Sequence, residues 1–210
     1  MKKRVVYVNG SFVDEDKAKV SVFDRGFLFA DAVYEVTAVI DGQILEWDGH
    51  VNRLERSLKE LDMKFPIPET ELLDIHFDLI KKNTLKEGLI YLQVTRGEDD
   101  RSFDYPDESV KPTLVLFTQV KSLAESNIAK TGLKVISVPD MRWGRRDIKT
   151  VQLLAPSMCK MMAKKKNKDD AWMIQDGFIT EGTSNNAYII TKDNVLITRN
   201  LSNDILAGVT

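Results

Sequence analysis

The sequence is poor in the residues that make disulfides and metal clusters. It has one cysteine, Cys159, and two histidines, His50 and His76, among 210 residues. A single thiol cannot close an internal disulfide, which fits a reducing compartment such as the cytoplasm. Because no cysteine and histidine cluster has metal-ligand spacing, we expect no metal site.

The sequence also lacks a strong charge of one sign and a long apolar run. The 30 basic and 32 acidic residues nearly cancel, so no global basic field favours nucleic acid or an anionic membrane. No apolar run approaches the roughly 18 residues that span a bilayer. The apolar stretch behind the basic N-terminus is too short for a signal peptide. We therefore expect a soluble, cytoplasmic protein that binds neither nucleic acid nor membrane.

Two glycine-rich nucleotide-binding patterns are missing as well, since neither G-x-G-x-x-G nor G-x-x-x-x-G-K-[ST] occurs. His50 falls in the first turn of an expected helix and His76 inside the next one, where a structural role is the default. The basic run 164–168 is typical of a solvated helix end. By elimination, chemistry would fall to lysine, arginine, tyrosine or carboxylate side chains. Spacing alone does not say which lysine is reactive.

The composition that remains is that of a globular protein, with 43% hydrophobic and 30% charged residues. Asp41-Gly42 between two apolar runs is a strong hairpin signal. Apolar residues at helical spacing follow, with Asp48 as the expected cap. The patterns predict helices over 48–61, 72–83 and 153–166, and strands over 4–8, 19–23, 32–40, 43–47, 89–95, 113–120, 133–138, 171–174, 178–180, 187–191 and 195–198.

Strands dominate, and the helices come in blocks, which indicates an α+β protein. The length allows one or two domains. We expect a boundary near residue 121, with an N-terminal α+β domain over 1–120 and a second domain over 121–210. The polar stretch 97–112 is predicted to be a long loop, and long loops in compact domains are often functional.

Several motifs follow one another in an order that resembles a known family. They are Ser21-Val22-Phe23-Asp24-Arg25-Gly26, Val33-Tyr34-Glu35-Val36, His50-Val51-Asn52-Arg53-Leu54, Val94-Thr95-Arg96-Gly97, Arg145-Arg146-Asp147-Ile148-Lys149-Thr150 and Thr180-Glu181-Gly182-Thr183-Ser184-Asn185-Asn186. The chain resembles the fold-type IV (class IV) pyridoxal-phosphate aminotransferases, and within them the D-amino-acid (D-alanine) transaminase branch.

This resemblance implies a two-domain fold with an N-terminal α/β sandwich and a C-terminal, β-rich, barrel-like domain. It also implies that the second domain is incomplete, because family members continue beyond the position of Thr210. The implied cofactor is pyridoxal 5'-phosphate. The family's reactive lysine matches Lys149, which would form the Schiff base and serve as the base for proton transfer. The partner of the pyridine nitrogen matches Glu181.

The remaining site residues also come from the resemblance. Arg53 matches a phosphate ligand, and Val209 and Thr210 match the stretch that binds the phosphate at a helix start. Leu206 would pack near the cofactor ring. The family pattern makes Tyr34 and Arg101 ligands of the substrate carboxylate, with Arg101 supplied by the neighbouring subunit. The branch commonly has a histidine where this chain has Phe103, which makes a bulkier D-amino acid or an (R)-amine more plausible.

The resemblance thus predicts a homodimeric transaminase that moves an amino group between a D-amino acid and a 2-oxo acid. Which amino donor it prefers stays open. The alternatives within the same fold are a branched-chain L-amino-acid transaminase, an (R)-amine transaminase and an aminodeoxychorismate lyase. A different class of protein, an inactive truncated remnant that only associates with other chains, is the remaining alternative.

Overall fold

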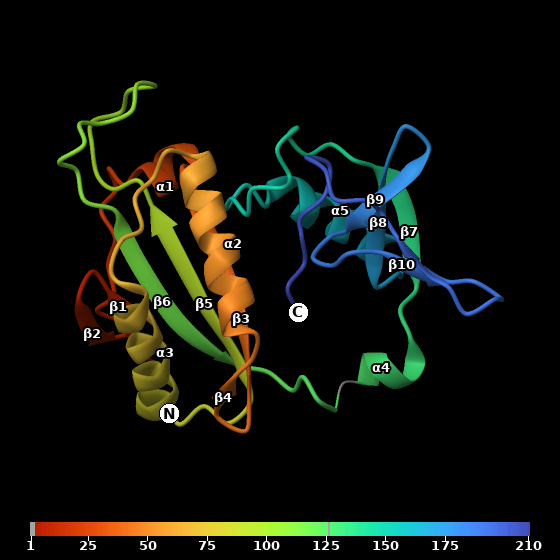
Figure 1. The fold of residues 1–210 in the computed structure, drawn as a ribbon, viewed down its shortest axis with the longest axis horizontal. Coiled ribbons are helices and arrows are strands. Elements are labelled where there is room, and N and C mark those ends of the chain that lie inside the picture. Colours follow the sequence, from red (N-terminus) through yellow and green to blue (C-terminus); the bar gives the residue numbers. More distant parts are fainter. Residues whose placement is uncertain (1–2, 126) are drawn as a thin grey trace. The chain divides into compact units, whose positions relative to one another are not determined.

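The computed structural model describes residues 3–125 and 127–210. Its contacts divide the chain into two compact units, drawn in Figure 1. Unit 1 holds Met1–Glu125, Lys149–Val151 and Val209–Thr210, and unit 2 holds Ser126–Ile148 and Gln152–Gly208. The mixture of helices with largely antiparallel sheets confirms the predicted α+β class. The division into domains over 1–120 and 121–210 stays a prediction.

Unit 1 is built on a six-stranded antiparallel sheet with the order β2-β1-β6-β5-β3-β4. The turn between β3 and β4 has positive φ at both Asp41 (52°) and Gly42 (74°), as an Asp-Gly hairpin requires. The strands are β1 (Val5–Val8), β2 (Ser11–Asp14), β3 (Ala32–Ile40), β4 (Gln43–Ile44), β5 (Gly88–Thr95) and β6 (Thr113–Val120).

Three helices belong to unit 1: α1 (Arg25–Phe29), α2 (Trp47–Glu60) and α3 (Glu69–Asn83). α2 packs against β3, and α3 packs against β1 and β6 (Figure 1). Leu54, Leu58, Leu72 and Leu79 of these two helices are almost completely buried. Burial of each such side chain stabilises the fold by about 1.5–3 kcal/mol. The apolar residues that recur at helical spacing in the sequence therefore form the helix faces that pack in the core.

Two short segments from late in the chain complete unit 1. Val151 donates its backbone N–H to the Ala32 carbonyl at 3.2 Å, and Thr150 forms an isolated bridge with Val33, so this segment lies along β3. Val209 lies over Gly49 in α2. A Cβ at Gly49 would come within 2.9 Å of Val209 Cγ1, so only glycine leaves this space.

Unit 2 contains a three-stranded sheet and a separate hairpin. β7 (Val135–Pro139) and β8 (Asp170–Gln175) are parallel, and α5 (Leu154–Lys165) supplies the crossover that a parallel pair needs. β9 (Phe178–Gly182) pairs antiparallel with β8. α5 packs on β7 and β8 around the buried side chains of Val138, Cys159, Ala163, Ala171 and Met173. The short helix α4 (Asn127–Thr131) and the hairpin of β10 (Tyr188–Ile190) and β11 (Leu196–Thr198) complete the unit.

Three local predictions were wrong. Residues 19–23 form no strand, because Val20 and Val22 are exposed and the segment instead leads to the Asp24 cap of α1. The predicted strand 43–47 stops at Ile44, since α2 already begins at Trp47. Asp48 is not the cap of α2: it lies in the first turn, and Glu46 takes the cap position without a side-chain hydrogen bond.

Within the described ranges, 3–125 and 127–210, no helix has the length and apolarity to cross a bilayer.

Candidate active site

Lys149 is held against β3 by its main chain. Its carbonyl accepts the Tyr34 N–H at 3.0 Å, and its own N–H donates to Ser57 Oγ of α2 at 3.3 Å. The ammonium lies 4.2 Å from the centre of the Tyr34 ring, a cation–π contact. Lys149 is therefore fixed at its backbone between a strand and a helix, and its side chain is directed at an aromatic face.

Tyr34 belongs to an aromatic row that crosses three strands. Its ring stacks on Tyr91 with centroids 5.6 Å apart, and Tyr91 stacks on Phe117 at 4.9 Å. Burial raises the pKa of Tyr91 to about 12, with Tyr34 as a smaller cause, so that phenol is neutral at ordinary pH. The row fixes Tyr34 from the side opposite to Glu35, because successive strand residues face opposite sides of a sheet.

The helix-facing neighbour Glu35 organises a buried charge cluster. Arg53 donates to Glu35 through Nε (2.8 Å) and through a terminal nitrogen (2.7 Å), and Glu35 Oε2 also lies 2.7 Å from His50 Nδ1. Burial acts to raise the pKa of Glu35, but the bonds from Arg53 and His50 outweigh it and lower that pKa. The Lys149 charge adds to this effect. Glu35 is thus ionised and holds the Arg53 guanidinium in one orientation.

Val209 and Thr210 lie at the same helix. Val209 contacts Gly49, as described above, and Thr210 Oγ1 lies 3.4 Å from His50 Nε2. His50 therefore links Glu35 on one ring nitrogen to Thr210 on the other. In unit 1, Tyr34 lies on β3 and Arg53 on α2. Lys149 and Thr210 contact these two elements from later segments of the chain.

Glu181 lies in unit 2, on β9, where its side chain is largely buried. One carboxylate oxygen pairs with Arg142, and the other accepts from Asn186 Nδ2 (3.2 Å) and the Leu206 N–H (3.3 Å). Burial raises the pKa of Glu181 above its usual value, although Arg142 acts against that rise. Leu206 is half-buried, and its carbonyl accepts from Asn186 at 2.9 Å. Unit 2 thus brings Glu181 and Leu206 together.

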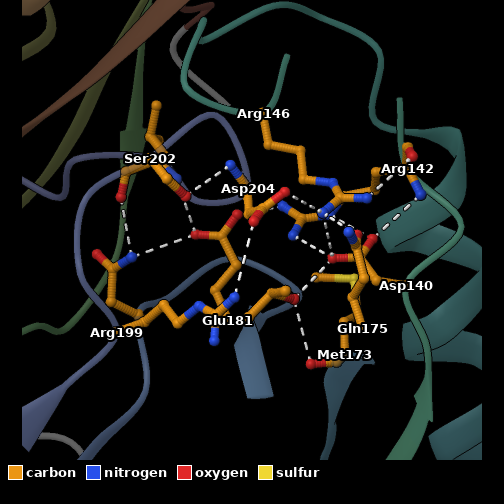
Figure 2. Close-up of polar contacts among 12 residues, drawn as sticks. Asp140, Arg142, Arg146, Met173, Gln175, Glu181, Arg199, Ser202 and Asp204 are labelled. Atoms are coloured by element: carbon orange, nitrogen blue, oxygen red, sulfur yellow. Dashed lines mark hydrogen bonds and ion pairs between the residues drawn. The ribbon is translucent and has the colours of Figure 1, made fainter. Parts of the chain in front are cut away.

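Arg142 connects Glu181 to a chain of alternating charges, shown in Figure 2. Its Nε and second terminal nitrogen donate to the two oxygens of Asp140 at 3.0 and 2.7 Å. Asp140 also lies 3.5 Å from Arg146, which donates to Gln175 at 2.6 Å. Arg146 is buried in this cluster, and Arg145 pairs with Asp147, so both arginines of the lysine motif have acidic or amide partners.

Arg101 and Phe103 lie in the polar loop between β5 and β6. The Arg101 guanidinium lies 5.4 Å from the Phe29 ring and 5.7 Å from the Phe103 ring, and Phe103 is 83% exposed. Arg25 holds the loop at its base through hydrogen bonds to the carbonyls of Ser102 (2.8 Å) and Asp104 (3.2 Å). The loop is anchored in unit 1, and these two side chains contact Phe29.

Sequence reasoning missed three residues that these clusters depend on: Glu35, Asp140 and Arg142. Glu35 and Arg53 are 18 positions apart, and Arg142 and Glu181 are 39 apart, so no local spacing joins them. One usable signal existed, because His50 and Arg53 are three residues apart on one helix face. Among the residues that the structure describes, no group of three or more His, Cys, Asp or Glu could hold a metal ion.

Comparison with known proteins decides the family. The family model described as amino-transferase class IV matches residues 32–210. The chain belongs to the class IV aminotransferases.

Among its curated class IV relatives are the D-alanine aminotransferases of Staphylococcus haemolyticus and Staphylococcus epidermidis. They are 36% and 37% identical to the chain over 205 residues, which are 98% of this chain and 72% of each relative. A solved branched-chain amino acid aminotransferase from Escherichia coli shares the fold with a TM-score of 0.85 and 20% identity, over 99% of this chain and 71% of the other. Another solved branched-chain amino acid aminotransferase, with pyridoxamine 5'-phosphate, matches with a TM-score of 0.86 at 20% identity, over 100% of this chain and 71% of the other.

Class IV aminotransferases depend on pyridoxal 5'-phosphate, and the chain is an aminotransferase of this type. The donor set fits that cofactor. Unit 1 offers a primary amine at Lys149 and an oriented guanidinium at Arg53, and unit 2 offers a buried carboxylate at Glu181. These are the groups that an aldehyde, a phosphate and a pyridine nitrogen require.

Proposed function

We propose that this class IV aminotransferase moves an amino group between a D-amino acid and a 2-oxo acid. Amino acid and 2-oxo acid substrates follow from the family. The D-configuration is supported by the relatives, which are named D-alanine aminotransferases and span nearly the whole chain. The observation that carries the proposal is Lys149, whose main chain is fixed to Tyr34 and whose ammonium lies over the same ring.

Lys149 is the catalytic residue of this proposal. Its amine would hold the cofactor, and the same amine would be the base that moves the proton of the substrate Cα. When bound, pyridoxal phosphate supplies an electron-accepting ring. Tyr34 keeps the Lys149 side chain on one side of the sheet edge, which supports transfer of that proton on one face of the substrate.

Arg53, Val209 and Thr210 would hold the phosphate of the cofactor. A guanidinium offers a rigid fork of donors to phosphate oxygens, and Glu35 fixes the plane of that fork through two hydrogen bonds. Thr210 contributes its hydroxyl, which His50 contacts, and Val209 contributes its backbone N–H. This arrangement binds the cofactor and does not take part in proton transfer.

Glu181 and Leu206 serve the cofactor ring. The Glu181 carboxylate would accept a hydrogen bond from the protonated ring nitrogen, and Leu206 would lie near the ring. Tyr34 and Arg101 bind the substrate carboxylate, and Phe103 beside Arg101 offers no donor to that group. We further infer that Arg101 reaches the site of a second protomer in a homodimer, since it lies beside Phe29 and Phe103 on an exposed loop.

We also infer a cytoplasmic location. The one cysteine, Cys159, is buried in unit 2 as a free thiol, which suits a reducing compartment.

The first experiment replaces Lys149. We expect Lys149→Ala to abolish amino transfer from D-alanine and to prevent borohydride from fixing a pyridoxyl group to the chain, as read by peptide mass spectrometry. The control is Lys86→Ala, an exposed lysine of unit 1 that should leave both readouts unchanged. Transfer at the original rate in Lys149→Ala would exclude this lysine as the catalytic residue.

The same preparations distinguish the substrate class. We expect wild-type protein to transfer the amino group of D-alanine faster than that of L-leucine when 2-oxoglutarate is the acceptor. A preference for L-leucine would instead place the protein with the branched-chain enzymes, whose solved structures share its fold.

A further inference from the structure

Asp140, Arg142 and Glu181 of unit 2 form a chain of ion pairs that ends at the Glu181 carboxylate. Asp140 has no exposed side-chain surface, and both of its oxygens accept from Arg142. Thr180 Oγ1 donates to Asp140 at 2.6 Å, and the Arg142 backbone N–H donates to it at 3.1 Å. Asp140 therefore fixes Arg142 by three hydrogen bonds, more than the single bond that joins Arg142 to Glu181.

The two Glu181 oxygens have different environments. One pairs with the remaining terminal nitrogen of Arg142. The other accepts from two uncharged donors, Asn186 and the Leu206 N–H. A cation that approaches Glu181 therefore meets one oxygen already paired with a guanidinium and one that is held only by neutral groups.

Arg142 lies between two carboxylates and is bonded unequally to them. Its Nε and one terminal nitrogen bond to Asp140, and only the other terminal nitrogen bonds to Glu181, so Asp140 is the main counter-charge of Arg142 and one Glu181 oxygen stays available to a further cation. Burial acts to raise the pKa of Asp140, but Arg142 and Thr180 outweigh it and lower that pKa, so Asp140 remains ionised. Farther along the network, Arg146 is 3.5 Å from both Asp140 and Asp204, and Arg199 is 3.7 Å from Asp204.

Without this pair, Glu181 would sit in a medium that disfavours its charge. A buried carboxylate with only neutral donors takes up a proton at higher pH than one beside a guanidinium. A protonated Glu181 has no charge to offer the ring nitrogen. With Arg142 but without Asp140, an uncompensated guanidinium would repel the protonated nitrogen.

We propose that Arg142 and Asp140 are positioning residues with separate effects on Glu181: Arg142 keeps the carboxylate ionised, and Asp140 leaves its charge free for the ring nitrogen of the cofactor. This inference rests on the proposed role of Glu181. Arg142 holds the carboxylate in its charged form, and Asp140 cancels the charge of Arg142. The two residues therefore act on the proton affinity of Glu181 in opposite directions.

The test follows the titration of Glu181 in the full chain without added cofactor, by ¹³C NMR of protein labelled at glutamate side-chain carboxyls. The signal that disappears in Glu181→Gln is assigned to Glu181. We expect Arg142→Met to move its titration midpoint upward by about one to three pH units. We expect Asp140→Asn to move it downward, because a nearby negative charge is lost.

Two further variants make the result specific. Arg142→Lys keeps the positive charge, so its midpoint should differ from the wild-type midpoint by less than about half the displacement seen for Arg142→Met. Arg142→Lys also replaces Arg142→Met if that variant does not fold. Arg199→Met, at the outer end of the network and 29% exposed, should leave the midpoint unchanged. An unmoved midpoint in the Arg142 and Asp140 variants, or displacements in the same direction, would overturn the inference.

The proposed function is tested separately. If Glu181→Gln transfers amino groups at the wild-type rate, Glu181 is not the partner of the ring nitrogen, and the inference fails with that role whatever the titration shows. If Glu181→Gln transfers amino groups slowly while the titration midpoints do not move, the proposed function stands and only the role of Arg142 and Asp140 is wrong. Support requires slow amino transfer by Glu181→Gln together with displacements of the titration midpoint in opposite directions in the Arg142 and Asp140 variants.

Discussion

At the scale of single residues, Glu35 joins the candidate lysine to the candidate phosphate ligand. It accepts two bonds from Arg53, one contact from His50, and the electrostatic influence of Lys149. A buried carboxylate that serves three cationic or potentially cationic groups cannot be replaced by a neutral group without removing the charge partner that Glu35 gives to the Arg53 guanidinium. The cost of breaking a buried pair in this way is about 3–5 kcal/mol.

We therefore expect Glu35→Gln to lower the free energy of unfolding at pH 7 by about 3 kcal/mol. The pKa of Glu35 is lower in the folded state than its ordinary value of 4.5, so this stabilisation is fully present above pH 4.5 and is lost as the pH falls through the folded-state pKa. The difference between wild type and variant should shrink below pH 4.5 in urea titrations followed by circular dichroism.

The control for this prediction is Glu55→Gln, at an exposed position of the same helix as Arg53. It should change the free energy of unfolding by less than about 0.5 kcal/mol. A Glu35→Gln protein as stable as this control would show that the buried pair contributes nothing to the fold.

At the scale of elements, the packing of α2 on α3 uses an aromatic contact and a buried histidine. The rings of Trp47 and His76 meet edge to face with centroids 4.9 Å apart, and His76 Nδ1 lies 2.8 Å from the Leu72 carbonyl. Beside them is a small cavity between the helices and the sheet, lined partly by Thr37, Val51 and Leu92. Burial lowers the pKa of His76 from 6.5 to about 4, so the ring is neutral in the folded protein.

This neutral histidine makes stability depend on pH. Between pH 6.5 and about 4 the unfolded chain binds a proton that the folded chain does not, so stability must fall as the pH decreases through this window. The loss is about 3 kcal/mol for a shift of this size. We expect wild type to lose most of this amount between pH 7 and pH 4.5 in chemical denaturation, and His76→Phe to lose much less. An equal pH dependence in both proteins would rule out His76 as its source.

How far the elements could be predicted depends on whether their signals were local. The helix over 48–61 and the strand pairs closed by Asp41-Gly42 and Asp176-Gly177 were predictable, because period and turn chemistry lie within a few residues. The strand predicted over 19–23 failed because alternation requires a partner strand, and this segment has none in the described sheet. The parallel pairing of β7 with β8 is also nonlocal, since 30 or so residues with a helix intervene.

The residues of the candidate site also differ in whether a local signal in the sequence identifies them. Lys149, Arg53 and Glu181 are site predictions that come only from the ordered motifs that resemble a family, and neither charge nor spacing would have selected them. Their partners Glu35 and Arg142 were missed, because a buried ion pair depends on which strand lies beside which helix or loop. Pairing of this kind is a property of the folded chain.

At the scale of the whole molecule, the proposed homodimer predicts a specific complementation. Lys149→Ala and Arg101→Ala proteins should each be impaired, the second about tenfold with D-alanine because charge-assisted bonds to the carboxylate are lost. If Arg101 acts on the site of the partner protomer, mixed dimers contain one site with both residues intact. Mixing should then restore up to about a quarter of wild-type activity, since random exchange makes half of the dimers mixed.

The measurement is amino transfer after the two variants are unfolded together and refolded, with each variant refolded alone as the control. Light scattering should report a dimer in every sample. Activity no higher than the mean of the separate variants would mean that Arg101 serves its own protomer or is only structural.

The short segment that carries Lys149 also has a consequence for how the protein is made. Its bridge to β3 joins Thr150 to Val33, over a hundred residues earlier in the chain. Closing so long a loop is entropically costly and slow, and contacts of high sequence separation form late. During synthesis the six strands of unit 1 are all translated before Lys149, so the sheet begins to form first. The strand that receives Lys149 is therefore made before Lys149 itself, and docking of this segment is a late step in the folding of the unit.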